Sequence, residues 1–319
     1  MERFFCSHTP LAAKVGASVG VLRGVIVWLI NGLRWRSRRF LSDCVPDRIV
    51  LARRFERTFG RPLNLKDPQT FNEKLFWLML YYRTPVVTRL ADKYEVRSYV
   101  AERVEPGILN ELYGVWDRVA DIDFERLPDA FVLKVTWGSG MNIFCRKKSE
   151  LSVHDTKEQL NSWMKRNYYW DYREWCYKKI KPRIICERLF ADSIRGTPPD
   201  YKFFCFGGEP RFVQIDVDRF TQHGRDFFDL DWQPLPFTYV YPSSGQTIPR
   251  PSNLDEIVAF ARRLSRGFPF VRVDFYCVVG RTVFGEMTWY PEAGEGRFLP
   301  ESYDRYWGEV LQLPARKGN

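Results

Sequence analysis

Residues 270–291 constrain the fold and function of this chain more strongly than any other stretch. Two runs rich in β-branched and aromatic residues, 271–279 and 282–287, flank Gly280-Arg281. Such runs joined by a short turn containing glycine are typical of an antiparallel β-hairpin. We therefore expect an antiparallel sheet near the C-terminus.

Three charged side chains are expected to meet on this hairpin. Arg272 and Asp274 alternate with apolar residues, so they project from one face of the first strand. Glu286 lies near the end of the second strand, which returns toward Asp274. Two carboxylates can hold Mg²⁺ through oxygen ligands while the guanidinium meets an anionic substrate. The alternative is an ordinary cross-strand charge cluster on a solvated face, and this stretch alone does not separate the two.

Composition indicates a folded globular protein. The 319 residues are 45% apolar and 28% charged, enough for a large core. Seven scattered cysteines form no CxxC pair, and we interpret Cys186, Cys205 and Cys277 as buried thiols in a reducing cytoplasm. The three histidines lack ligand spacing, which argues against a zinc site and against a Ser-His-Asp or Cys-His hydrolase.

Positive charge is concentrated toward the N-terminus. The net charge is +10, and residues 32–61 contain nine arginines against three acidic residues. No zinc finger, RRM or helix-turn-helix signature accompanies this charge, so we expect no nucleic-acid partner. An anionic membrane surface or an acidic polysaccharide is the expected partner.

The N-terminal segment 11–33 is apolar but contains Lys14 and Arg23. An arginine near the centre of a membrane-spanning helix costs about 3 kcal/mol, so a true span is not expected. With the basic residues that follow, residues 11–39 suit a helix lying on the inner face of the membrane. A helix packed on the core with a basic flank is the other interpretation. The predicted localisation is cytoplasmic, with peripheral membrane contact under the first interpretation.

Periodicity and turn residues predict the other elements. A helix begins near Thr70, and Glu73 three residues later completes a capping box. Residues 131–145 indicate strand, glycine loop and strand, and Gly207-Gly208 turns a second hairpin. Further helices are expected at 86–103, 151–181 and 254–266.

One lysine lies directly before the glycine loop. Lys134 is in the strand that precedes Gly138-Ser139-Gly140, a flexible loop whose backbone amides can close over phosphates. The pattern is neither a Walker A loop nor a Rossmann GxGxxG. A plain hairpin turn is the alternative interpretation.

The order of these motifs resembles the TupA-like ATP-grasp family, named for teichuronopeptide biosynthesis. The resemblance covers roughly residues 48–313 and rests on motifs at 68–74, 91–94, 131–134 with 138–140, 200–206, 270–274 and 284–286. It implies an α+β ATP-grasp fold, in which two α+β subdomains grip ATP between antiparallel sheets. The implied domains are a helical N-terminal extension at 1–47 and a helical region at 48–125. A subdomain with the glycine loop and hinge follows at 126–190, and a C-terminal subdomain with the Mg²⁺ site at 191–319.

The resemblance also implies which residues bind the nucleotide. Lys134 matches the strand lysine that contacts the phosphates and the adenine edge, and Arg97 falls where many such enzymes place a second phosphate-binding lysine. Glu187 matches the side chain that hydrogen-bonds adenine. The phosphate-covering loop of the family matches Ser139, Gly140 and Met141. The hinge backbone matches Arg188 and Leu189, and a ribose contact matches Asp192.

The hairpin residues match the metal and catalytic positions of the family. Asp274 and Glu286 match the two acidic Mg²⁺ ligands, and Arg272 matches the arginine that stabilises an acyl-phosphate. The usual third ligand is an asparagine, whereas this chain has Thr288, a weaker neutral ligand. Lys202 faces the expected nucleotide region, either as a catalytic lysine that meets a phosphate or as a solvated strand lysine.

The implied function is an ATP-dependent carboxylate-amine ligase that uses ATP and Mg²⁺ and proceeds through an acyl-phosphate. Its implied partners are an amino acid and an acidic or amino-sugar polysaccharide, or a lipid-linked precursor, held near the basic aromatic segment 165–179. Three alternatives remain open. Asp216-Val-Asp218 is a DxD, as in glycosyltransferases; an ATP-grasp-fold sugar kinase would keep ATP and Mg²⁺; and a non-catalytic scaffold would follow if Thr288 abolished metal binding.

Overall fold

The computed structural model describes residues 45–190, 200–217, 222–278 and 280–316. The chain divides into two units, Met1–Val50 and Leu51–Asn319, and the description below concerns the second. The predicted membrane contact of residues 11–39 and the predicted ribose contact of Asp192 lie outside the described residues. None of the helices in the described ranges has the length and apolarity needed to cross a membrane.

A four-stranded antiparallel sheet carries Lys134 and Glu187. Its strand order is β1-β4-β2-β3, and Val132 of β2 lies opposite Glu187 of β4. Because side chains alternate along a strand, Lys134 and Glu187 project from the same face. The sheet includes a strand in the range 48–125, where we expected helices. The strands are β1 Leu112–Trp116, β2 Phe131–Val135, β3 Asn142–Cys145 and β4 Ile184–Arg188.

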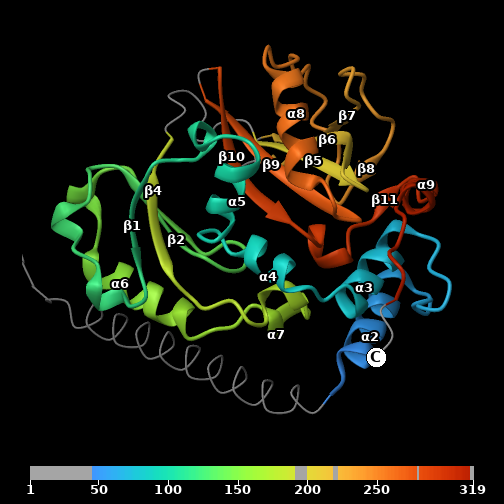
Figure 1. Cartoon of the computed structure of the whole chain (residues 1–319), viewed down its shortest axis with the longest axis horizontal. Helices are drawn as coiled ribbons and strands as arrows, with labels where there is room; N and C mark the ends of the chain where they lie inside the picture. The colour runs from blue at the N-terminus through green and yellow to red at the C-terminus, as the bar shows by residue number, and fades with distance from the viewer. Residues whose placement is uncertain (1–44, 191–199, 218–221, 279, 317–319) are drawn as a thin grey trace, which may run out of the picture. The chain divides into compact units, whose positions relative to one another are not determined.

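A five-stranded antiparallel sheet is formed by later strands (Figure 1). Two of them, β9 and β10, contain the predicted metal residues. The strand order of this sheet is β10-β9-β5-β6-β7, and a small two-stranded sheet pairs β11 with β8. The hairpins predicted at Gly280 and at Gly207-Gly208 are both confirmed. The strands are β5 Asp200–Phe206, β6 Glu209–Val217, β7 Gly224–Phe228, β8 Thr238–Tyr239, β9 Phe270–Val278, β10 Arg281–Thr288 and β11 Phe298–Leu299.

Two of the predicted helices are present and two are interrupted. The capping box of Thr70 and Glu73 is confirmed, and the helix expected at 254–266 is α8. The helix expected at 86–103 is broken at Asp92, whose backbone leaves the helical region. The main α-helices are α2 Asp47–Phe59, α3 Phe71–Tyr81, α4 Pro85–Ala91, α5 Val96–Arg103, α6 Val153–Met164, α8 Leu254–Ser265 and α9 Ser302–Val310.

The segment 151–181 was predicted to be helical throughout, which is wrong for its second half. After α6 only the short α7 Tyr169–Tyr172 follows, and it ends at Arg173, whose φ is 60°. The guanidinium of Arg173 lies 4.6 Å from the centre of the Trp170 ring, a cation–π contact between residues three positions apart. The short 3₁₀ helices are η1 Pro106–Ile108, η2 Val119–Asp121, η3 Phe124–Arg126, η4 Lys148–Glu150, η5 Trp175–Tyr177 and η6 Pro291–Gly294.

One face of the five-stranded sheet has an apolar half and a polar half. Phe204, Phe206 and Phe270 lie in the apolar half, where Phe71 of α3 packs edge-on against Phe270 at 5.0 Å. Trp307 of α9 stacks on Phe206 at 5.5 Å. The helix α8 contacts β5, β6 and β9, and its apolar side chains are buried. Helices α3 and α9 therefore cover the apolar half, and the candidate site lies in the polar half.

A substitution at Gly308 tests the packing of α9 on α3. A Cβ at this position would lie 2.1 Å from the carbonyl oxygen of Gln69, which is backbone just before α3. We expect Gly308→Ala to lower the free energy of unfolding by about 1–3 kcal/mol, because the two helices must move apart. Urea unfolding measures the change. Glu309→Ala, at the exposed neighbouring position, is the control, and equal stability of the two variants would contradict this packing.

Candidate active site

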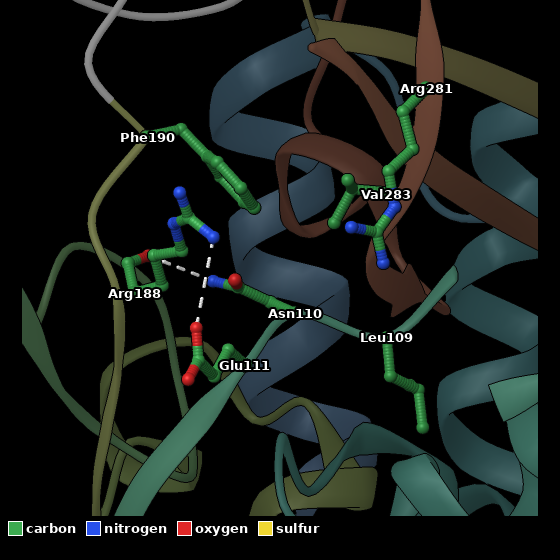
Figure 2. A pocket seen from close by; sticks show the side chains of 7 residues that line it. All are labelled: Leu109, Asn110, Glu111, Arg188, Phe190, Arg281 and Val283. Atoms are coloured by element: carbon green, nitrogen blue, oxygen red, sulfur yellow. Dashed lines mark hydrogen bonds and ion pairs between the residues drawn. The ribbon is translucent and has the colours of Figure 1, made fainter. Parts of the chain in front are cut away.

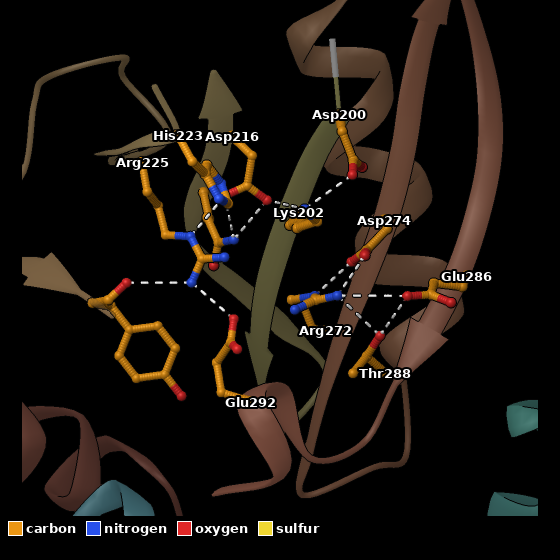
Figure 3. Close-up of polar contacts among 12 residues, drawn as sticks. Asp200, Lys202, Asp216, His223, Arg225, Arg272, Asp274, Glu286, Thr288 and Glu292 are labelled. Atoms are coloured by element: carbon orange, nitrogen blue, oxygen red, sulfur yellow. Dashed lines mark hydrogen bonds and ion pairs between the residues drawn. The ribbon is translucent and has the colours of Figure 1, made fainter. Parts of the chain in front are cut away.

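The hairpin places four polar side chains together on the polar half of the sheet (Figure 3). Asp274 pairs with Glu286 across the strands, and Arg272 pairs with Thr288. Arg272 donates two hydrogen bonds to the carboxylate of Asp274, at 2.8 and 2.7 Å. It also donates to Thr288 Oγ1 at 3.1 Å, and that hydroxyl donates to Glu286 Oε1 at 3.2 Å. The residues that we predicted from one hairpin therefore form one hydrogen-bonded cluster.

The two carboxylates of this cluster have different electrostatic environments. Burial raises the pKa of Asp274 above its usual range, and Arg272 opposes this rise. Burial also favours a higher pKa for Glu286, but Lys93 and Arg272 outweigh it and lower that pKa to about 2. The side chain of Glu286 is 42% exposed. Glu286 is thus an ionised carboxylate that solvent and ions can reach.

The oxygen donors of this cluster fit a magnesium ion. Two carboxylates and one hydroxyl on neighbouring strands are hard ligands of the kind that Mg²⁺ prefers. The described part of the chain holds no group of three or more His, Cys, Asp or Glu residues suited to a metal. A site with two carboxylates suits Mg²⁺ that takes its other ligands from water and substrate phosphates.

A second charged cluster lies on the four-stranded sheet. Glu187 accepts a hydrogen bond from Lys134 Nζ at 2.8 Å and another from Arg97 Nη1 at 2.9 Å. Arg97 also donates to the backbone oxygen of Asn110 at 2.6 Å. The side chain of Glu187 is only 8% exposed. One buried carboxylate therefore holds both of the cations that we predicted to contact phosphates.

The glycine loop follows β2 and is anchored at its first glycine. Gly138 has a φ of +79°, and a Cβ there would lie 2.8 Å from the ring of Tyr168. Ser139 and Gly140 are exposed, whereas Met141 is buried. Two residues of the loop are thus accessible to a ligand, while its flanks are packed.

Lys93 was missing from the predicted site, although the structure places it between the glycine loop and Glu286. Its Nζ donates to the backbone oxygen of Gly138 at 2.9 Å and lies 3.4 Å from Glu286 Oε2. Its backbone nitrogen donates to the oxygen of Thr136 at 2.8 Å. The motif 91–94 contains this lysine, so the resemblance supplied a signal, but we assigned the cation to Arg97 instead.

Lys202 is buried within a network of opposite charges instead of being solvated. Its Nζ lies 2.9 Å from Asp200 Oδ2 and also forms an ion pair with Asp216. Asp216 further accepts from Arg225 Nε at 2.7 Å, and His223 Nε2 lies 3.1 Å away. Burial favours a higher pKa for Asp216, but Lys202 and Arg225 together lower it well below its usual range. Three cationic or potentially cationic groups surround Asp216 (Figure 3), which argues against metal binding by this residue of the DxD. The second aspartate of the motif, Asp218, lies outside the described residues.

Arg225 extends this network toward η6. It donates to Glu292 Oε1 at 2.8 Å and to the backbone oxygen of Tyr239 at 3.2 Å. Nothing in the sequence near 225 pointed to this role, because the partners of Arg225 lie on three separate elements, β6, β8 and η6.

A cavity of about 250 Å³ opens beside the predicted adenine hinge (Figure 2). Phe190 and Arg188 lie on one side and Val283 on the other. The backbone nitrogen of Arg188 donates to Glu111 O at 3.0 Å, and its oxygen accepts from Asn110 Nδ2 at 2.9 Å. The hinge backbone at this residue is therefore already hydrogen-bonded. The lining residues are Leu109, Asn110, Glu111, Arg188, Phe190, Arg281 and Val283, and Leu189 lies between two of them in sequence.

A buried carboxyl group, Glu174, makes the stability of the fold dependent on pH. Glu174 is 5% exposed, and burial raises its pKa to about 8, with Arg54 opposing and Glu286 adding to the rise. Between about pH 4.5 and 8 the folded protein therefore holds a proton that the unfolded chain has lost. The free energy of unfolding should fall as pH rises through this window, by up to ~1.4 kcal/mol per pH unit.

Glu174→Gln should remove this dependence, because glutamine carries no titrating proton. We expect the variant to be close to wild type at pH 4.5 and more stable than wild type at pH 8.5. Urea unfolding at several pH values measures the difference. Glu158→Gln, on an exposed helix face, is the control. Parallel stability curves for wild type and Glu174→Gln would contradict the raised pKa.

Comparison with known proteins identifies the family. Residues 73–312 match the model of the TupA-like ATPgrasp family. A search of curated proteins finds no match. Similar solved structures include the ATP-grasp ligase PsnB complexed with a minimal precursor, at 10% identity and a TM-score of 0.38. An ADP complex of purK, N5-carboxyaminoimidazole ribonucleotide synthetase, has 10% identity and a TM-score of 0.42. D-Alanine–D-alanine ligase from Bacillus anthracis complexed with ATP has 12% identity and a TM-score of 0.37.

The solved structures are only partly covered by this chain. The similarity spans 65%, 64% and 63% of this chain and 54%, 46% and 53% of the three proteins, so the chain spans about half of their length. The family match and the two antiparallel sheets confirm the predicted family and its α+β ATP-grasp fold. Because the match covers well over half of the sequence, this chain belongs to the TupA-like ATP-grasp family.

Proposed function

We propose that this protein is an ATP-dependent carboxylate-amine ligase that uses Mg²⁺. The observation that carries the proposal is the cluster of Arg272, Asp274, Glu286 and Thr288 on one sheet face, in a chain of the ATP-grasp family. A glycine loop, with Lys93 between it and Glu286, accompanies this cluster. Cations and carboxylates in this arrangement suit phosphoryl transfer, which requires charge neutralisation more than covalent catalysis.

The proposed reaction has two steps. A substrate carboxylate oxygen bonds to the γ-phosphorus of ATP, and the bond to the ADP oxygen breaks. The amine nitrogen then bonds to the acyl carbon, phosphate leaves with the electron pair of its C–O bond, and the nitrogen loses a proton. Bound Mg²⁺ would supply charge neutralisation at the phosphates.

Residues of this chain have distinct proposed roles. Asp274 and Glu286 would hold the metal, with Thr288 as a weak third ligand. Arg272 would stabilise the charge that develops on the acyl-phosphate. Its guanidinium lies beside Asp274 and Glu286, the two carboxylates proposed to hold the metal at the phosphates. Lys134 and Arg97 would bind phosphates, Glu187 would meet adenine, and the loop at Ser139 would exclude water from an intermediate that hydrolyses easily. Lys202 is proposed to position Asp200 and Asp216, because the two carboxylates hold its ammonium.

We further propose that the ligase joins an amino acid or peptide to a cell-surface polysaccharide or its lipid-linked precursor. The proposal rests on the resemblance stated above and on the excess of positive charge, which suits an acidic polymer. A cytoplasmic enzyme that contacts the inner membrane face through residues 11–39 would meet such precursors where they are made. Nucleic acid is not a proposed partner.

One assay tests this function. Purified protein is given ATP, Mg²⁺, a pool of amino acids and an acidic polysaccharide, and ADP and phosphate are measured. Release of both products only when amino acid and polysaccharide are present together supports the ligase. Transfer of phosphate to sugar, or release of UDP from UDP-sugars, would overturn it.

A further inference from the structure

The ammonium of Lys93 connects two elements that lie far apart in the sequence. It bonds to the glycine loop through Gly138 O at 2.9 Å and pairs with Glu286 Oε2 at 3.4 Å. The first element joins strands of the four-stranded sheet, and the second belongs to the five-stranded sheet. A single side chain thus links the phosphate loop to a predicted metal ligand.

The position of Lys93 is built into the fold. The turn after α4 is held by Asp92, which accepts from the backbone nitrogens of Tyr94 at 2.8 Å and Glu95 at 3.1 Å. Asp92 also pairs with Arg183 at 3.2 Å. The backbone nitrogen of Lys93 donates a hydrogen bond to the oxygen of Thr136, directly after β2, and the side chain of Lys93 is 17% exposed. The ammonium is therefore held in place and is not a mobile surface charge.

Both oxygens of Glu286 face positive charge. Oε2 lies near Lys93, while Oε1 lies 3.6 Å from Arg272 and accepts from Thr288. A divalent cation that approaches Glu286 meets repulsion from both cations, which acts strongly at such short distances. Nucleotide phosphates carry enough negative charge to offset this repulsion. When nucleotide is absent, nothing offsets the repulsion between the metal ion and the two cations.

We propose that Lys93 is an internal competitor of divalent metal at Glu286 and, through the same ammonium, the tether of the glycine loop. Divalent metal then binds Glu286 together with nucleotide phosphates, and its affinity for Glu286 is weak when the phosphates are absent. The loop is held against the site by Lys93 until the phosphates arrive. This positioning role rests on the proposed function for its place in a reaction cycle, but the contacts themselves do not depend on catalysis.

The first experiment measures metal binding to the full chain without nucleotide, with Mn²⁺ as the probe and electron paramagnetic resonance as the readout. Lys93→Met keeps an unbranched side chain, one atom shorter, and removes its charge. We expect it to bind Mn²⁺ about tenfold more tightly than wild type, because a competing charge is lost. Lys93→Arg keeps the charge and should bind like wild type. Adding Glu286→Gln to Lys93→Met should abolish the gain.

Equal or weaker Mn²⁺ binding by Lys93→Met would overturn the competitor role, because a residue that only supports the fold cannot strengthen metal binding when removed. If Lys93→Met does not fold, as judged by circular dichroism, Lys93→Gln replaces it with the same expectation. A gain that survives Glu286→Gln would also overturn the proposal, because the metal would then bind elsewhere.

The second experiment measures amide hydrogen exchange of residues 137–141 without nucleotide. Exchange should be faster in Lys93→Met than in wild type and unchanged in Lys93→Arg, because only the first loses the bond to Gly138 O. Unchanged exchange in Lys93→Met would overturn the tether. Neither measurement requires turnover. If both give the expected result but the ligase assay fails, the proposed function is refuted and this inference stands.

Discussion

Glutamine in place of Glu286 is expected to lower kcat/KM for ATP hydrolysis or ligation by about 10³-fold. The substitution keeps the size of the side chain and removes the one carboxylate of the cluster that is both ionised and 42% exposed. Its amide would face two cations, Lys93 and Arg272, without a compensating charge. Steady-state kinetics at saturating Mg²⁺ measures the loss.

The control for this variant lies on the same sheet. Glu209→Gln removes a half-exposed carboxylate at the far end of β6, where its partner is Arg262. Surface ion pairs of this kind contribute about 0–1 kcal/mol, so activity and stability should stay close to wild type. Glu286→Gln with turnover like wild type would refute the assignment of the hairpin as the metal site, whatever the reaction is.

Replacing Glu187 by glutamine should produce the largest loss of stability among the variants proposed here. Glu187 is the common partner of Lys134 and Arg97 and is 8% exposed. Without its charge, two partly buried cations repel each other with no carboxylate between them. Removing one partner of such a buried cluster costs about 3 kcal/mol of unfolding free energy. Urea unfolding without nucleotide measures the loss, and Glu111→Gln, whose side chain is 58% exposed, is the control.

A double-mutant cycle separates the loss of charge from a loss of packing. Lys134→Met removes one of the two cations, so the pair Glu187→Gln and Lys134→Met should be more stable than the sum of the single changes predicts. We expect a coupling of at least about 1 kcal/mol between the two positions. Strictly additive losses would show that the cluster in the structure does not carry the stability.

The local part of this architecture could be predicted from the sequence. The hairpin of residues 270–288, the strand of Lys134 and the capping box of Thr70 each depend on neighbours a few positions away. Side-chain alternation, turn glycines and helix caps act over that range, so they are visible without a fold. The helices at 86–103 and 151–181 were overpredicted because tertiary contacts override helical propensity. Asp92 pairs with Arg183, 91 residues away, and Arg54 donates to the backbone oxygen of Tyr172, 118 residues away.

Which charges meet was decided by the tertiary structure. The sequence alone determined that Arg272, Asp274 and Glu286 share a hairpin face, and the resemblance supplied Lys134, Arg97 and Glu187 as separate matches. Only the tertiary structure shows that Glu187 pairs with both cations and that Lys202, Arg225 and His223 surround Asp216. Lys93 and Glu286 are 193 residues apart and meet only when the two sheets are assembled. The physical reason is that charge pairing acts over ångströms in space, while sequence patterns report only on neighbours along the chain.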